Sequence, residues 1–110
     1  MSPAYVPQAG DMVWLQFDPT LGHEQAGRRP AVVLSPADYN GKAGLVVCSP
    51  LTTKAKGYPF EVPIAGEPAS VVLADQVKSL DWRARLALCK GRLTPAELDQ
   101  VRAKLRALIG

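Results

Sequence analysis

Residues 11–18 have the sequence DMVWLQFD, in which apolar side chains recur at every second position. The side chains that share one side of this pattern are Val13, Leu15 and Phe17. A period of two is typical of a β-strand that buries one of its faces. Trp14 belongs to the same predicted strand, where we expect its large ring to be part of the core.

The strand pattern returns through the first two-thirds of the chain. Four further stretches are β-branched or apolar and are bounded by Pro, Gly, Asn or Asp, namely residues 30–35, 44–49, 59–64 and 70–74. Residues 85–93 alternate again. Six short strands with no helical stretch between them predict a small antiparallel barrel and a mainly β fold.

The C-terminal residues predict one helix. Thr94-Pro95-Ala96-Glu97 is a capping box, with proline at the first helical position, where an N–H donor is not needed. Apolar residues then recur at three- and four-residue spacing: Leu98, Val101, Leu105 and Leu108. We expect this stripe to pack on the barrel, and the opposite, solvated side to hold Asp99, Arg102 and Arg106.

The composition is that of one folded domain spanning residues 1–110. Hydrophobic residues make up 47% of the chain, which excludes wholesale disorder and allows a real core. The longest apolar runs, such as residues 31–34, contain four residues, whereas a membrane-spanning helix needs about 20. No signal sequence precedes Pro3 and Pro7, so we expect a cytoplasmic protein with no membrane partner.

The charge is modest but unevenly distributed. The 13 Lys and Arg residues exceed the 10 Asp and Glu residues by three, and the excess lies from residue 81 onward, which permits a polyanionic partner. A single histidine, His23, and two isolated cysteines lack the spacing of a metal site, so no metal or cofactor is expected. Cys48 and Cys89 both lie in apolar runs and are expected to pack as small hydrophobes.

Two polar stretches stand out between the predicted strands: residues 19–29 (PTLGHEQAGRR) and residues 51–58 (LTTKAKGY). Such loops in a compact β domain often carry function, although an ordinary mobile surface loop is the alternative for each. Arg29 precedes a proline at the start of a strand, where its planar guanidinium can bind a phosphate. The hydroxyls of Thr52 and Thr53 can bond a phosphate oxygen, whereas Glu24 has the alternative of a simple ion pair with a neighbouring arginine.

At these residues the chain resembles the MazF/PemK family of mRNA-interferase toxins over nearly its whole length. The matching stretches are YVPQAGDMVWLQFDPT, GHEQAGRRPAVVLSP, the TT and KGYPFEV segment, LADQVKSLDWRAR and the terminal ALIG. The resemblance implies an SH3-like barrel of the CcdB/PemK type and a homodimer. It also implies metal-independent cleavage of single-stranded RNA at short, ACA-type sites, and a cognate MazE-like antitoxin with an acidic tail.

The resemblance also implies roles for particular residues. Arg29 and Thr52 match the family's central catalytic pair, Glu24 matches its assisting carboxylate, and Gln76 falls where relatives contact RNA. Some PemK-type relatives use an aspartate in the region of Asp75, so that residue stays an alternative.

The chemistry of metal-free RNA cleavage agrees with this set. The 2′-OH must lose a proton and attack the phosphorus, which yields a 2′,3′-cyclic phosphate and a 5′-OH. We assign Arg29 to charge stabilisation on the phosphorane, since a guanidinium with a pKa above about 12 is a poor base. Glu24 is the better proton acceptor, and Thr52 holds a non-bridging oxygen.

Binding of single-stranded RNA requires aromatic rings for stacking and polar groups for base edges and phosphates. The aromatic candidates besides Trp14 are Phe17, Tyr58 and Trp82. The polar substrate-binding candidates are Gln25, Thr53, Lys56, Gln76 and Lys78. Lys56 and Lys78 have the alternative of being ordinary solvated lysines.

Two other functions fit a small SH3-like barrel. One is a binding module without catalysis, and the other is a gyrase-poisoning toxin of the CcdB type. Neither needs a carboxylate, a guanidinium and a hydroxyl beside one groove, so the set of Glu24, Arg29 and Thr52 favours the endoribonuclease.

Overall fold

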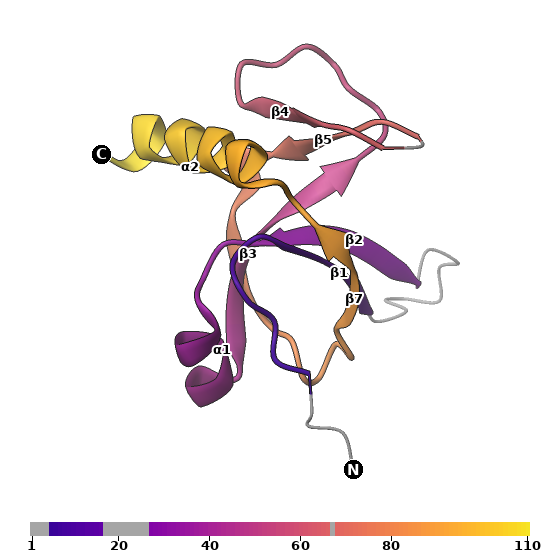
Figure 1. The fold of residues 1–110 in the computed structure, drawn as a ribbon, viewed down its shortest axis with the longest axis vertical. Coiled ribbons are helices and arrows are strands. Elements are labelled where there is room, and N and C mark those ends of the chain that lie inside the picture. The colour runs from indigo at the N-terminus through magenta and orange to yellow at the C-terminus, as the bar shows by residue number, and fades with distance from the viewer. Residues whose placement is uncertain (1–4, 17–26, 67) are drawn as a thin grey trace, which may run out of the picture.

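The computed structural model describes residues 5–16, 27–66 and 68–110, drawn in colour in Figure 1. The elements in this part of the chain, in order, are β1 (Asp11–Gln16), β2 (Arg28–Val33), α1 (Ala37–Ala43), β3 (Leu45–Thr52), β4 (Glu61–Ile64), β5 (Ser70–Leu73), η2 (Ala74–Gln76), β6 (Lys78–Asp81), β7 (Leu88–Arg92) and α2 (Pro95–Ile109). The predicted mainly β fold with a C-terminal helix is confirmed.

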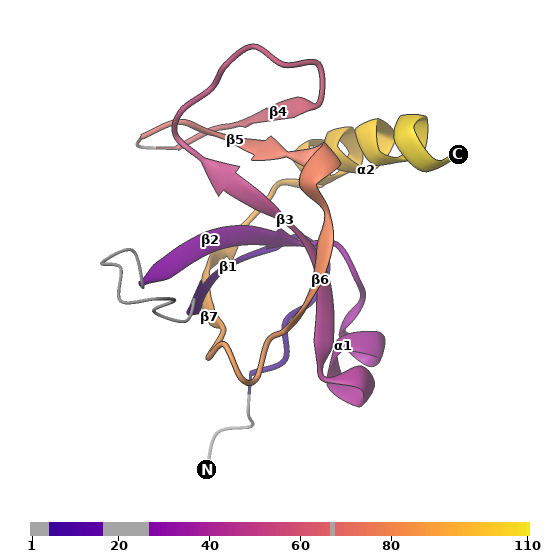
Figure 2. The ribbon, with the colours of Figure 1, turned by 180° about the vertical axis from the view of Figure 1, so that it is seen from behind.

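The eight-residue strand β3 connects the two parts of the sheet. All pairings are antiparallel, and the strand order is β4-β5-β3-β2-β1-β7. On its other edge β3 pairs first with β6, from Leu45↔Asp81 to Cys48↔Lys78, and then with β5 at Leu51 and Thr52. Figures 1 and 2 show β3 running from α1 up to the layer formed by β4 and β5.

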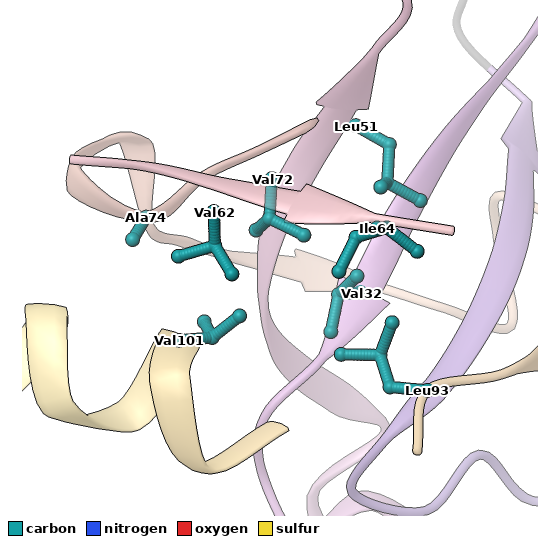
Figure 3. Packing of buried hydrophobic residues seen from close by; sticks show 8 residues of the cluster. All are labelled: Val32, Leu51, Val62, Ile64, Val72, Ala74, Leu93 and Val101. Atoms are coloured by element: carbon teal, nitrogen blue, oxygen red, sulfur yellow. The ribbon is translucent and has the colours of Figure 1, made fainter. Parts of the chain in front are cut away.

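Two hydrophobic clusters form the core, and alternate residues of β2 contribute to one or the other. The first packs α2 against residues of β2, β3, β4 and β5. It contains Val32, Leu51, Val62, Ile64, Val72, Ala74, Leu93 and Val101. Figure 3 shows Val101 of α2 directed toward Val62, with Val72 next to Val62 and Ile64 next to Val32. The second cluster fills the curve of β1, β2 and β3 and contains Val13, Leu15, Ala31, Val33, Val46, Cys48 and Trp82. The period-two pattern of residues 11–18 therefore predicted the buried face of β1 correctly.

Three predictions about single side chains were wrong. Trp14 is only half-buried, because it lies on the other face of β1, with the Arg28 guanidinium 5.2 Å and the Lys90 ammonium 5.4 Å from its ring centroid. Trp82 is 7% exposed and belongs to the second cluster, so it presents no ring for stacking. Cys89 is exposed on the edge strand β7, whereas Cys48 is buried as predicted.

The capping box of α2 is confirmed. Thr94 Oγ1 accepts from the Glu97 N–H at 3.1 Å, and the Glu97 carboxylate accepts from the Thr94 N–H at 2.9 Å. A second bond from the Ala65 N–H ties the helix to the loop after β4. The backbone hydrogen bond from Thr94 is the main cause that lowers the pKa of Glu97 below its ordinary value. The helix start is therefore fixed against the sheet by charge-assisted hydrogen bonds.

The helix α1 contradicts the expectation of no helix between the strands. Its seven residues include a glycine and an asparagine and have no apolar stripe, so tertiary contacts determine it rather than helix propensity. Asn40 is fully buried, and its side-chain amide donates to the carbonyls of Pro7 and Ser35. Its backbone carbonyl accepts from Trp82 Nε1 at 2.8 Å. This one residue joins α1 to the N-terminal segment and to the chain after β6.

Replacement of Asn40 by alanine should lower the free energy of unfolding by about 2–4 kcal/mol, because buried carbonyls would lose their hydrogen-bond donor. Urea denaturation of the two proteins measures the change. The exposed neighbour Asp38 provides the control, since Asp38→Asn should stay within about 0.5 kcal/mol of the unchanged chain. A loss below about 0.5 kcal/mol for Asn40→Ala would show that this network does not support the fold.

Candidate functional site

A cleft of about 710 Å³ opens where β2, β3, β5 and β6 meet the segment that follows β3. Its floor is apolar and includes Leu15, Ala31 and Leu51. Its polar lining residues are Arg29, Thr52, Lys54, Lys56, Tyr58, Glu61, Asp75, Gln76 and Lys78. Polar groups around an apolar floor can fix the orientation of a ligand.

Arg29 and Thr52 line the same cleft. The pairing of β2 with β3 reaches Ala31 and Pro50, and Arg29 and Thr52 each lie two residues beyond that pair. Because side chains of a strand alternate, both residues share a face with Ala31 and Pro50, which also line the cleft. Arg29 also pairs with Leu15 of β1 on its other side. The two residues predicted as the central pair therefore line one cleft.

The Thr52 hydroxyl is arranged to donate a hydrogen bond into the cleft. Its Oγ1 accepts from the Lys54 N–H at 3.1 Å, which uses one oxygen lone pair and leaves the hydroxyl hydrogen for another acceptor. Arg29 contributes guanidinium donors with a permanent charge. Together they offer donors and positive charge to an anionic oxygen.

The segment after β3 lines the cleft with every second residue. Thr52, Lys54, Lys56 and Tyr58 line it, and Tyr58 is 61% exposed. Thr53, which was predicted to bind substrate, is exposed and lies outside this lining. Sequence reasoning did not select Lys54, although the alternation that starts in β3 predicts it once Thr52 is known to face the cleft.

The opposite wall comes from the chain between β5 and β6. The single turn η2 interrupts what would otherwise be a continuous strand along β3, and it carries Asp75 and Gln76 into the cleft. Lys78 follows at the start of β6, opposite Cys48. The predicted residues Gln76 and Lys78 therefore line the same cleft as Lys56.

The cleft is positively charged. Among the described residues, four cationic side chains and two carboxylates line it. Cys48 is also in the lining, but burial raises the pKa of its thiol to about 11, with the charges of Lys78 and Arg85 opposing the shift. The thiol therefore stays protonated at neutral pH and is a poor nucleophile.

Phe17, Glu24 and Gln25 lie outside the described residues, so the roles predicted for them stay predictions. Within residues 5–16, 27–66 and 68–110, no three His, Cys, Asp or Glu side chains are grouped as metal ligands. In the same residues, neither helix has the length and apolar character to cross a bilayer.

Comparison with known proteins identifies the family. Residues 8–109 match the model of the PemK-like, MazF-like toxins of type II toxin–antitoxin systems. The chain is 58% identical to the endoribonuclease toxin MazF of Escherichia coli K12 over the full length of both, and 36% identical to the endoribonuclease toxin ChpB of the same organism over 93% of both.

Solved structures give the same result. The chain matches one in the crystal structure of MazE–MazF (form II) from Deinococcus radiodurans with a TM-score of 0.91 and 53% identity, over 97% of this chain and 98% of the other. The crystal structure of MazF (form I) from that organism matches with a TM-score of 0.84 over 97% and 99%. The family resemblance seen in the sequence is confirmed: the chain belongs to the PemK-like, MazF-like toxins of type II toxin–antitoxin systems.

Proposed function

We propose that the chain is a sequence-specific endoribonuclease toxin that cleaves single-stranded RNA without a metal ion, in the cytoplasm. The 58% identity to an endoribonuclease toxin over the full length supports the enzyme class. The presence of Arg29 and Thr52 in the lining of one cationic cleft supports the proposal for the chemistry. A binding module would not need a carboxylate, a guanidinium and a hydroxyl together beside one groove.

In the proposed reaction the 2′-oxygen attacks the adjacent phosphorus, and the bond from phosphorus to the 5′-oxygen breaks. Glu24 accepts the proton of the 2′-OH, and the leaving 5′-oxygen takes up a proton, so the products are a 2′,3′-cyclic phosphate and a 5′-OH. Arg29 and the Thr52 hydroxyl donate to the non-bridging oxygens, where negative charge increases in the transition state.

The remaining candidates hold the RNA strand. Lys56 and Lys78 contact phosphates from opposite walls, and Gln76 bonds a base edge. We assign Phe17, Gln25 and Thr53 to the same task, with a short ACA-type site as the sequence that is read. Specific recognition of unpaired bases is consistent with a cleft that mixes cations with polar side chains.

We further propose a MazE-like antitoxin as the partner. The structures from Deinococcus radiodurans contain such a toxin with MazE. An acidic segment of an antitoxin is complementary in charge to the cleft, so its binding would exclude RNA by occupying the same cations.

The chain is proposed to work as a homodimer. The last turns of α2 expose Leu108 (47%) and Ile109 (72%), and a groove of about 340 Å³ lies beside them. This groove is lined by Leu34, Ser35, Val47, Arg102, Leu105, Arg106 and Ile109. Arg102 and Arg106 were predicted on the solvated side of the helix. Arg106 is exposed and Arg102 is partly buried, and both line this groove with Leu105. A second copy would bury this apolar surface.

The site chemistry is tested by substitution of the two central residues. Arg29→Ala should lower kcat/KM on a short RNA by about 10²–10³-fold, and Thr52→Val by a similar factor, because each removes a donor to the phosphorane. Thr52→Ser keeps the hydroxyl and should retain most of the activity. Full activity of a folded Arg29→Ala protein would refute the assignment.

The reaction class is tested by the ends of the cleaved RNA. Incubation of the pure protein with a defined single-stranded RNA in EDTA should give cuts at one short sequence, with 5′-OH and cyclic phosphate ends identified by sequencing and mass spectrometry. RNA that stays intact with and without added Mg²⁺ would instead support the binding module or the gyrase-poisoning toxin. Cleavage that needs the metal would contradict the metal-free route.

The dimer is tested at the exposed end of α2. Ile109→Asp should convert the protein from twice the chain mass to the single chain mass in sedimentation velocity, because a charge would enter an apolar interface. Ala103→Asp adds the same charge to an exposed position on the far side of the helix and should leave the mass unchanged. If Ile109→Asp keeps twice the chain mass, as Ala103→Asp should, the interface lies elsewhere.

A further inference from the structure

Among the described residues, no strand pairs with residues 53–58, which contribute to one wall of the cleft. Regular pairing of β3 ends at Thr52, and β4 begins only at Glu61. Lys54, Lys56 and Tyr58 nevertheless all line the cleft. A specific interaction must therefore fix a segment that lacks sheet hydrogen bonds.

The carboxylate of Glu61 supplies that interaction. Its Oε2 accepts from the Lys56 N–H at 2.9 Å, and its Oε1 accepts from the Gly57 N–H at 3.0 Å. The Glu61 N–H in turn donates to the Tyr58 carbonyl at 3.1 Å. Glu61 is the first residue of β4 and pairs with Leu73 of β5, so these bonds attach the segment to the sheet.

The backbone of Gly57 makes this arrangement possible. Gly57 has φ of +80°, a left-handed conformation that favours glycine, and successive N–H groups beside such a residue can converge on one anion. Here the anion is the protein's own carboxylate. The bonds are charge-assisted, which makes them stronger than the bonds of an ordinary turn.

We propose that Glu61 is a positioning residue for RNA binding, because it holds Lys54, Lys56 and Tyr58 in the order in which a single strand meets them. This inference rests on the proposed function. Lys54 and Lys56 then contact phosphates of successive nucleotides, and the exposed ring of Tyr58 stacks on a base. Glu61 itself touches no reacting atom.

The proposal predicts a change in RNA affinity on removal of Glu61 that is opposite to the change expected from electrostatics alone. Removing a carboxylate from the rim of a cationic cleft should by itself tighten the binding of a polyanion. If Glu61 positions the segment, removal of Glu61 weakens RNA binding instead. Binding must then also order residues 54–58, which costs conformational entropy.

The experiment compares Glu61→Gln with the unchanged chain in steady-state cleavage of a short RNA. KM should rise about five- to tenfold while kcat changes less than about twofold, because the central pair is left in place. Hydrogen exchange should show faster exchange of the Lys56 and Gly57 amides in the variant. Asp99→Asn removes the same charge from an exposed position on α2 and should leave KM unchanged.

A second variant removes the backbone conformation and keeps the carboxylate. Among the described residues, no atom lies within 4 Å of a Cβ added at Gly57, so Gly57→Ala acts through its left-handed backbone and should also raise KM. An unchanged or lower KM for folded Glu61→Gln would overturn the positioning role. If the unchanged chain cleaves no RNA, the proposed function fails instead, so the two failures are distinguishable.

Discussion

The antiparallel register between β2 and β3 is the constraint on which the site depends. Three observed pairs, from Ala31↔Pro50 to Val33↔Cys48, fix the alternation, and Arg29 and Thr52 lie two residues beyond Ala31 and Pro50 and line the same cleft as them. A slip of one residue would turn Val33 and Ala31 out of the second cluster and would turn Arg29, which lies on the same face of β2, out of the cleft. The burial of these apolar side chains therefore holds a guanidinium and a hydroxyl together, without any direct bond between them being required.

The other polar side chains of the cleft come from two segments next to β3, one before β6 and one after Thr52. On one side η2 interrupts the path from β5 to β6 and turns polar side chains inward. On the other side the unpaired segment after Thr52 is held by a carboxylate rather than by a strand. Both walls carry cations that repel one another, so the packed sheet supplies the free energy that keeps them close. A site of this kind is suited to a polyanion, which relieves the repulsion when it binds.

The sequence predicted the large features because they leave local patterns. Alternation in residues 11–18 and the capping box at Thr94 require only neighbouring residues. The alternation was confirmed over the described residues 11–16, and the capping box and the family were confirmed as well. Features fixed by distant contacts were missed. The helix α1 depends on Asn40 reaching Pro7 and Trp82, and the half-exposed Trp14 depends on Arg28 and Lys90 from adjacent strands. Lys54 was missed because the end of β3 was placed too early, at residue 49 instead of Thr52.

A double-mutant cycle on Arg29 and Thr52 tests most directly whether the two residues act on the same phosphate. The values of kcat/KM for Arg29→Lys, Thr52→Val and the double variant give their coupling energy. Because both donors are proposed to meet one phosphorane, the two losses should be clearly non-additive, with a coupling of about 1 kcal/mol or more. Strict additivity, within about 0.3 kcal/mol, would show that the residues act independently and would contradict the account.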